Sequence, residues 1–236
     1  MDYLVVPLGE NFWSIEQRGV RSFLFAGETN AILVDTGFGG DLPTVCHTLT
    51  QQPITLLTTH ADIDHIGCDA AFSVHYMHPA EWERYQNSGA NMGTLRPIWE
   101  GDVFSVGAYT LEAVLIPGHT PGSIALLDRK NGILLSGDSV QDGCIYMHGN
   151  GRCLAALKYS LQKLNELRIS GAFDTIYASH GTVKLPADII EDHLEMVGGV
   201  LEHKLLPVSQ APERFPQQVK VFAFGRAKMY YDDSAN

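Results

Sequence analysis

Residues 59–67, THADIDHIG, contain two histidines and two aspartates within six positions: His60, Asp62, Asp64 and His65. Imidazole nitrogens and carboxylate oxygens are the ligands that zinc and other first-row divalent ions take in proteins. The stretch directly follows a compact apolar run, residues 53–60, which is typical of a buried strand ending at His60. Functional groups gather in the loops at strand ends. The pattern therefore predicts a metal-binding loop.

Three more residues of the same types occur at the ends of apolar runs, each beside a glycine: His119 in IPGHTPGS, Asp138 in LLSGDS and His180 in YASHG. One histidine in such a place is more often an ordinary polar residue than a ligand. All of them together make seven potential ligands, four histidines and three aspartates. A tetrahedral ion takes four ligands, so this set suits two ions that share one carboxylate and one bridging solvent molecule.

The order of these segments resembles a known family. The matching segments are VDTG (34–37), HADIDH (60–65), PGHTPGS (117–123) with SGD (136–138), and SHG (179–181). They resemble the motifs of the metallo-β-lactamase-fold hydrolase superfamily, in particular its glyoxalase II-like and lactonase-like branches. The resemblance implies an α+β fold, a four-layer αββα sandwich of two mixed β-sheets with helices outside, and a dinuclear site at one edge of the sheets.

The resemblance also implies a role for each residue. His60, Asp62 and His119 would bind a first metal ion, Asp64, His65 and His180 a second, and Asp138 would bridge the two. Asp64 and Asp138 are then the expected catalytic residues, with Asp64 able to relay a proton. Asp35, in VDTG, is expected to support a ligating histidine from behind rather than to bind metal. The expected cofactors are two divalent ions, zinc first, with iron or manganese as alternatives.

The chain departs from the family pattern at one position. The superfamily usually has HxHxDH, and this chain has HxDxDH, with Asp62 in the second slot. The additional carboxylate predicts a less positive site, a weaker Lewis acid and some preference for iron or manganese. Asp62 has a second interpretation, in which it hydrogen-bonds a neighbouring ligand and does not bind the first metal.

Hydrolysis is the expected chemistry: a metal-bound hydroxide would attack the carbonyl of an ester, thioester, lactone or amide of a small molecule. Asp62 keeps a second function open, a di-iron protein that reduces oxygen or nitric oxide with electrons from a separate donor. A third is a non-catalytic metal-binding or sensing module. Glutathione thioesters are not favoured as substrates, because the six basic residues after His180 are scattered.

Composition limits the partners and the compartment. The chain has 236 residues, 45% of them hydrophobic, and a net charge of −11 without any Lys/Arg cluster. Nucleic-acid and membrane partners are not expected, because both rely on clustered cations, and a small-molecule substrate is. The first residues do not read as a signal peptide, and the four cysteines form no CxxC pair, so a cytoplasmic location is expected.

The remaining pattern predicts the elements that position the ligands. Short strands are expected over the first third of the chain, followed by a helix over 41–49 with Asp41 as its N-cap. Helices are expected over 152–168 and 185–206, a mobile loop over 87–97, and a C-terminal hairpin over 218–232. The hairpin could complete a sheet or pair across a homodimer. All of this is expected to form a single domain, 1–236.

Five further residues outside the predicted ligand set have a pattern that predicts their place. Tyr146 and His148, in the segment CIYMHGNGR, are candidates for contact with the substrate. His47, His193 and His203 are expected on the surface, because they lie in stretches with helical spacing.

Overall fold

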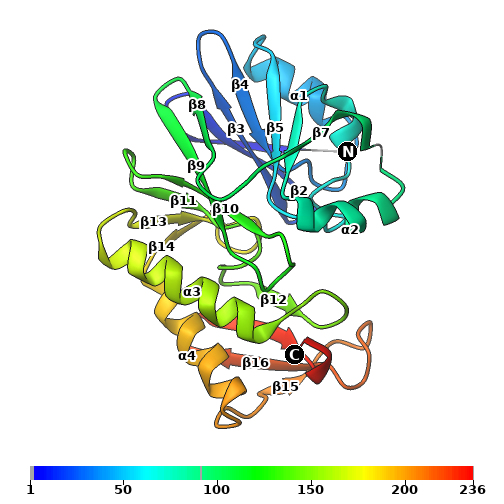
Figure 1. Ribbon diagram of the computed structural model, residues 1–236, viewed down its shortest axis with the longest axis vertical. Coiled ribbons are helices and arrows are strands. Elements are labelled where there is room, and N and C mark those ends of the chain that lie inside the picture. Colours follow the sequence, from blue (N-terminus) through cyan, green and yellow to red (C-terminus); the bar gives the residue numbers. More distant parts are fainter. Residues whose placement is uncertain (1–2, 91, 236) are drawn as a thin grey trace. The chain divides into compact units, whose positions relative to one another are not determined.

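A seven-stranded sheet organises the first half of the chain in the computed structural model, which describes residues 3–90 and 92–235 (Figure 1). The strands follow one another across the sheet in chain order: β1 (Leu4–Gly9), β2 (Phe12–Gln17), β3 (Val20–Ala26), β4 (Ala31–Val34), β5 (Ile54–Thr58), β6 (His75–Met77) and β7 (Leu95–Pro97). The pairs from β1 to β4 are antiparallel and those from β4 to β7 are parallel. Parallel neighbours need crossover connections. These connections contain the helices and the predicted metal-binding loop, residues 60–65, which is called the ligand loop below.

The crossovers contain α1 (Leu42–Leu49), the 3₁₀ turns η1 (Asp69–Ala71), η2 (Pro79–Glu81) and η3 (Met92–Thr94), and the short helix α2 (Trp82–Asn87). An antiparallel hairpin, β8 (Val103–Val106) and β9 (Tyr109–Leu115), follows. The chain divides into two compact units, Met1–Val114 and Leu115–Asn236, called the N-terminal and C-terminal units below. The expectation of a single domain stays a prediction.

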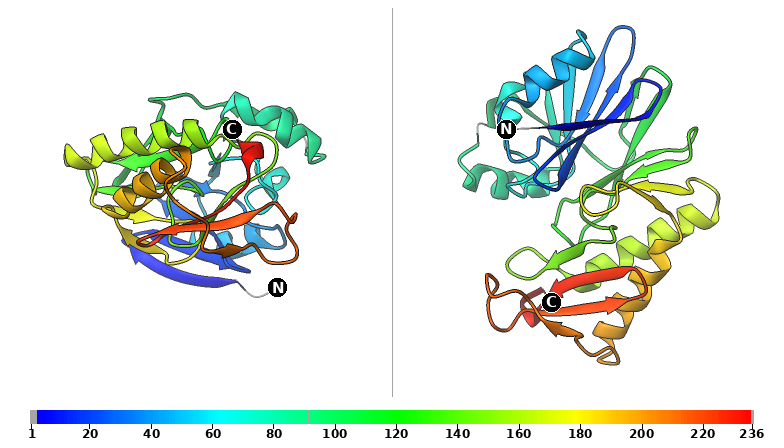
Figure 2. Two further views of the ribbon diagram at one scale, coloured as in Figure 1. Left: turned by 90° about the horizontal axis from the view of Figure 1, so that it is seen from below. Right: turned by 180° about the vertical axis from the view of Figure 1, so that it is seen from behind.

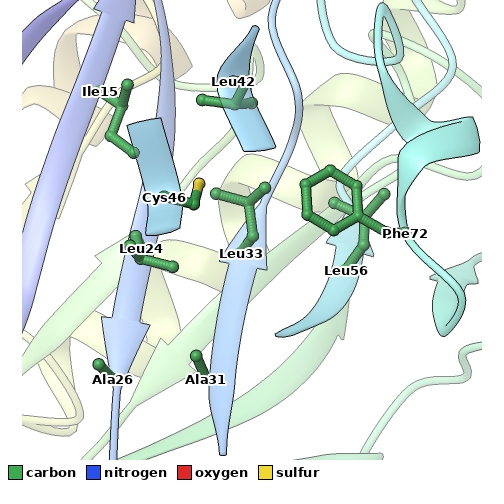
Figure 3. Packing of buried hydrophobic residues seen from close by; sticks show 9 residues of the cluster. All are labelled: Ile15, Leu24, Ala26, Ala31, Leu33, Leu42, Cys46, Leu56 and Phe72. Atoms are coloured by element: carbon green, nitrogen blue, oxygen red, sulfur yellow. The ribbon is translucent and has the colours of Figure 1, made fainter. Parts of the chain in front are cut away.

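The hydrophobic core of the N-terminal unit lies between α1 and the sheet. Figure 3 shows Leu42 and Cys46 of α1 beside Leu24 and Leu33 of the central strands. These side chains are almost completely buried, and each buried leucine contributes about 1.5–3 kcal/mol of hydrophobic stabilisation. The expected helix is therefore present, although its N-cap residue, Asp41, makes no side-chain capping bond within the described residues.

Two sheets and two long helices make up the C-terminal unit (Figure 2). In the first sheet β10 (Ile124–Asp128), β11 (Ile133–Leu135), β13 (Thr175–Tyr177) and β14 (Lys184–Pro186) are neighbours in that order. The second has the order β12 (Cys144–Met147), β17 (Ala227–Tyr231), β16 (Lys220–Phe224), β15 (Ser209–Gln210). The helices α3 (Leu154–Ile169) and α4 (Ile189–Leu201) pack together, and α4 also packs on β16 and β17. The 3₁₀ turn η4 (Asp233–Ala235) follows β17.

Helical periodicity correctly identified α3. Leu154, Leu157, Leu161 and Leu164 recur every three or four residues and are all fully buried. That spacing places them on one face of a helix. The expected C-terminal hairpin is present as β16 and β17, which turn at Gly225.

Three expectations about local structure were wrong. The helix expected over residues 185–206 forms only over Ile189–Leu201, as α4: Pro186 lies in β14, an edge strand, where proline is tolerated because no ladder bond needs its missing N–H. The segment 87–97, expected as a mobile loop, contains η3 and β7 among its described residues, and residue 91 lies outside them. His193, expected on the surface, is completely buried in α4, where its Nε2 donates to the Gln141 carbonyl at 2.9 Å. His47 and His203 are exposed, as expected.

Candidate metal centre

The ligand loop of the N-terminal unit begins where two parallel strands end. β4 and β5 are parallel neighbours, with Val34 opposite Leu57, so their carboxyl ends lie at the same edge of the sheet. Asp35 follows β4, and Thr59 and His60 follow β5. A backbone bond from the Asp35 N–H to the Leu57 carbonyl, 3.0 Å long, continues the pairing to this edge. The sheet therefore brings Asp35 beneath the histidines of the loop.

Within the loop, each histidine presents its Nε2 toward an aspartate. His60 Nε2 lies 3.7 Å from Asp62 Oδ2, and His65 Nε2 lies 3.9 Å from Asp64 Oδ1. Both rings are buried, whereas the aspartate side chains keep 15% and 23% of their surface exposed. The ring centroids of the two histidines are 4.0 Å apart. The loop thus holds two imidazoles side by side, each with a carboxylate at its Nε2.

Asp35 fixes the orientation of both rings. Its carboxylate is fully buried and accepts hydrogen bonds from the Thr59 N–H at 2.7 Å, the Thr59 hydroxyl at 2.8 Å and His65 Nδ1 at 2.9 Å. Because the Thr59 hydroxyl proton goes to Asp35, its oxygen accepts from His60 Nδ1, 3.0 Å away. Both rings therefore use Nδ1 as a hydrogen-bond donor, which leaves Nε2 as the nitrogen that can bind a metal ion. The expected supporting role of Asp35 is consistent with this network.

Asp62 has a cationic neighbour that motif reading missed. Arg84, on α2, places its Nη2 2.7 Å from Asp62 Oδ1. The two residues are 22 positions apart in the sequence, and no spacing rule connects them. The contact leaves Asp62 Oδ2 as the oxygen that lies toward His60 Nε2.

A buried polar network lies behind the loop. Asp69 accepts from the Thr36 hydroxyl at 2.5 Å and lies 3.3 Å from His75 Nε2. Burial, the largest cause, raises the pKa of Asp69 to about 7 and lowers that of His75 to about 4. Burial and the nearby Asp69 also raise the pKa of Cys68 to about 11. At neutral pH, and without a bound metal ion, Cys68 is therefore a neutral thiol.

The C-terminal unit presents its predicted ligands in the same way. β11 and β13 are parallel neighbours, with Leu135 opposite Tyr177. Asp138 follows β11 and His180 follows β13, so both lie beyond the carboxyl ends of these strands. His119 lies in the turn before β10, which pairs antiparallel with β11. Because β10 runs opposite to β11, it begins at the edge where β11 ends, and the turn before it lies at that edge.

The two histidines both face one oxygen of the Asp138 carboxylate. Asp138 Oδ2 lies 3.7 Å from His119 Nε2 and 3.4 Å from His180 Nε2. His119 Nδ1 donates to the Tyr146 carbonyl at 3.1 Å, and the guanidinium of the buried Arg152 donates to the His119 carbonyl. His119, like His60 and His65, is therefore held with Nε2 toward a carboxylate.

The donor atoms fit a divalent transition metal. Two atoms bound to one tetrahedral ion at about 2.0–2.2 Å lie about 3.3–3.6 Å from each other. The four nitrogen–oxygen separations, 3.4–3.9 Å, are near that distance, and each exceeds the usual length of a hydrogen bond. Neutral imidazole and carboxylate are ligands of zinc, and the mixture also suits iron and manganese.

The seven predicted ligands thus form two sets, four residues in the N-terminal unit and three in the C-terminal unit. Tyr146 and His148 lie in a cluster of aromatic rings with Phe215 and Tyr230. Arg214 donates from Nη2 to the Tyr146 hydroxyl at 3.2 Å. That Tyr146 and His148 contact a substrate stays a prediction. Sequence reasoning missed Arg84, Arg152 and the carbonyl of Tyr146.

The model of the metallo-β-lactamase superfamily matches residues 15–180 of the chain. The chain belongs to this superfamily. The expectation that it is an enzyme of this hydrolase superfamily is thereby confirmed.

Individual proteins agree with the assignment. The chain is 26% identical over 218 residues to a Gallus gallus protein named acyl-coenzyme A thioesterase MBLAC2, covering 74% of this chain and 79% of the relative. It is 29% identical over 142 residues to the Bacillus velezensis protein named probable polyketide biosynthesis zinc-dependent hydrolase BaeB, covering 57% and 61%.

Among solved structures, a metallo-β-lactamase from Pontibacter korlensis superposes with a TM-score of 0.72 at 18% identity, covering 84% of this chain and 99% of that one. This likeness confirms the fold class expected from the sequence. Among the described residues, every helix is too short or too polar to cross a membrane.

Proposed function

We propose that the two ligand sets together bind two zinc ions, and that the chain hydrolyses a thioester or ester of a small molecule. His60, Asp62 and His119 would hold the first ion, Asp64, His65 and His180 the second, and Asp138 both. The observation that carries the proposal is the set of four histidine–carboxylate pairs with nitrogen–oxygen separations of 3.4–3.9 Å. Membership of the superfamily supports joining the two sets into one centre.

The ions, when bound, would lower the pKa of a coordinated water toward 7 and polarise the scissile carbonyl. The chain's own residues supply orientation and proton transfer. Asp35 would keep Nε2 of both histidines directed at the ions, through Thr59 for His60 and by a direct hydrogen bond for His65. Asp64 accepts the proton of the attacking water, since its side chain is partly exposed and can pass that proton to solvent.

A thioester is the first substrate class to test, because the thioesterase MBLAC2 is a relative that matches most of the chain. The aromatic cluster of Tyr146, His148, Phe215 and Tyr230 would contact the acyl portion or the thiol or alcohol leaving group of the substrate. Tyr146 connects this cluster to the metal ligands, because its backbone carbonyl accepts the hydrogen bond from His119.

The test compares hydrolysis of short acyl-coenzyme A thioesters with matched oxygen esters and lactones. We expect turnover that a chelator abolishes and zinc restores. Asp64→Asn and Asp138→Asn should each lose at least about 100-fold in kcat. The control is Asp128→Asn, at a buried aspartate that caps a turn through the N–H groups of Lys130 and Asn131.

Full turnover by Asp138→Asn with both ions retained would contradict the assigned bridge. A different result would support the redox function that Asp62 leaves open. In that case the purified chain would contain two irons, hydrolyse none of the substrates and consume oxygen when an electron donor is added.

A further inference from the structure

The carboxylate at position 62 is paired with a cation that comes from a different element. Asp62 Oδ1 lies 2.7 Å from Arg84 Nη2, while Asp62 Oδ2 lies 3.7 Å from His60 Nε2. One oxygen of the carboxylate thus meets the guanidinium, and the other lies on the side of the neighbouring ligand. A carboxylate held in this way has a defined rotation about its last side-chain bond.

Arg84 can hold Asp62 because α2 is attached to the ligand loop. The carboxylate of Glu81, which is fully buried just before α2, accepts a hydrogen bond of 2.8 Å from the Ala61 N–H, between His60 and Asp62. One turn further along, Tyr85 packs in a buried cluster with Ala61. A polar and an apolar contact thus fix the helix to the residue next to Asp62, and Arg84 lies between these two points in the sequence.

The pair changes the charge count at the site. Two divalent ions and three carboxylates leave a charge of +1, whereas the usual histidine at position 62 leaves +2. The cation of Arg84 restores +2. A charge count over the ligands alone predicts a less positive site. That count is incomplete, because it omits the guanidinium of Arg84 beside Asp62.

We propose that Arg84 is a positioning residue for the first metal ion, and that the Asp62–Arg84 pair takes the place of the neutral histidine found in HxHxDH. The guanidinium orients Asp62 so that Oδ2 binds the ion, and it offsets the additional negative charge. The inference rests on the proposed function, since it assumes that the first ion is bound by His60, Asp62 and His119.

The alternative is an ordinary surface ion pair. The Arg84 side chain is 38% exposed, and exposed pairs contribute about 0–1 kcal/mol to stability. Stability therefore does not separate the two readings. They differ in what happens to zinc affinity when residue 62 becomes neutral, because the Arg84 cation then repels the ion with no carboxylate between them to offset the repulsion.

The test is a double-mutant cycle with zinc affinity as its readout, measured by chelator competition on protein freed of metal and titrated with zinc alone. Asp62→His leaves the cation of Arg84 beside a neutral ligand and a dication, so the first zinc should bind weakly. Adding Arg84→Gln to Asp62→His should strengthen binding of the first zinc by about tenfold or more. In the native background, Arg84→Gln should instead weaken binding of the first zinc, because Asp62 loses the guanidinium that orients its Oδ2.

The matched control is Arg96→Gln, at another arginine of the N-terminal unit, which donates to the Tyr76 hydroxyl. Combined with Asp62→His it should leave zinc affinity unchanged, and affinity for the second zinc should be the same throughout the cycle. Equal affinity for the first zinc in Asp62→His and in the double variant Asp62→His, Arg84→Gln would overturn the inference. Failure of both of these variants to bind the first zinc would also overturn it. If the native chain itself binds no zinc, the proposed function fails before the cycle is reached.

Discussion

Replacing Asp35 with asparagine should weaken zinc binding without removing any ligand. The native carboxylate accepts three hydrogen bonds, two from Thr59 and one from His65. The amide has one oxygen and one NH₂ group, which only donates. Whichever way it is rotated, NH₂ faces either the Thr59 N–H or the side-chain donors of Thr59 and His65. At least one buried donor is then left facing another donor.

The size of the effect follows from these contacts. Loss of a supporting partner of a ligating histidine typically costs about 10–100-fold in metal affinity, which corresponds to about 1.4–2.7 kcal/mol. A hydrogen bond to a charged group adds about 1.5–3 kcal/mol to stability in the metal-free protein. Asparagine is the right replacement because Asp35 has φ +60°, a left-handed conformation that asparagine tolerates and alanine does not.

The assay is zinc competition with a chromophoric chelator, together with urea unfolding of the metal-free protein. Asp128→Asn is the control, since Asp128 is also buried and caps a turn in the C-terminal unit. It should lose stability but keep its zinc affinity. An Asp35→Asn protein that binds two zinc ions as tightly as the native chain would refute the assigned role of Asp35.

Three further predictions concern stability. A Cβ at Gly118, which has φ +141°, would lie 2.4 Å from the backbone of Leu157, so Gly118→Ala should cost about 3 kcal/mol or more in urea unfolding. Gly171→Ala, where φ is +80° and nothing lies within 4 Å, should cost about 1 kcal/mol; equal losses would show that the contact with Leu157 is not tight. Burial lowers the pKa of His193 from 6.5 to about 4. The stability that this shift confers is present above pH 6.5 and lost as pH falls through 4, on the order of 3 kcal/mol. Unfolding of His193→Gln should therefore depend less on pH over that range, and an unchanged slope would contradict the assignment. Burial raises the pKa of Asp69 from 3.8 to about 7, so the stability it confers is present below pH 3.8 and lost as pH rises through 7. Asp69→Asn should gain stability relative to the native chain from pH 4 to pH 7, and parallel pH curves would argue against a buried, protonated Asp69.

Local patterns predicted the parts of the site that depend on short spacing. The ligand loop 60–65 follows one strand, and His119, Asp138 and His180 each lie beside a glycine at the end of an apolar run. Strand ends and glycines are visible in a single sequence. The helix α3 and the hairpin of β16 and β17 were predicted for the same reason, since each is specified within fewer than 20 residues.

Features that depend on distant partners were not predictable. Arg84 reaches Asp62 only because Glu81 and Tyr85 attach α2 to Ala61. The strand β12 exists because Cys144–Met147 pairs in parallel with Lys228–Tyr231, more than 80 residues further on. His193 has the spacing of an exposed helical residue, but α4 packs between α3 and the strands β16 and β17, which bury it. In each case the structure depends on tertiary packing, which local sequence propensity does not predict.

The central claim is that the chain binds two metal ions through the seven residues assigned. The most direct measurement is the metal content of protein purified without added metal, by elemental analysis, followed by zinc titration of the metal-free chain. The account predicts two zinc ions per chain, and one in a variant that lacks both Asp64 and His65. A native stoichiometry of one or none after titration would contradict it.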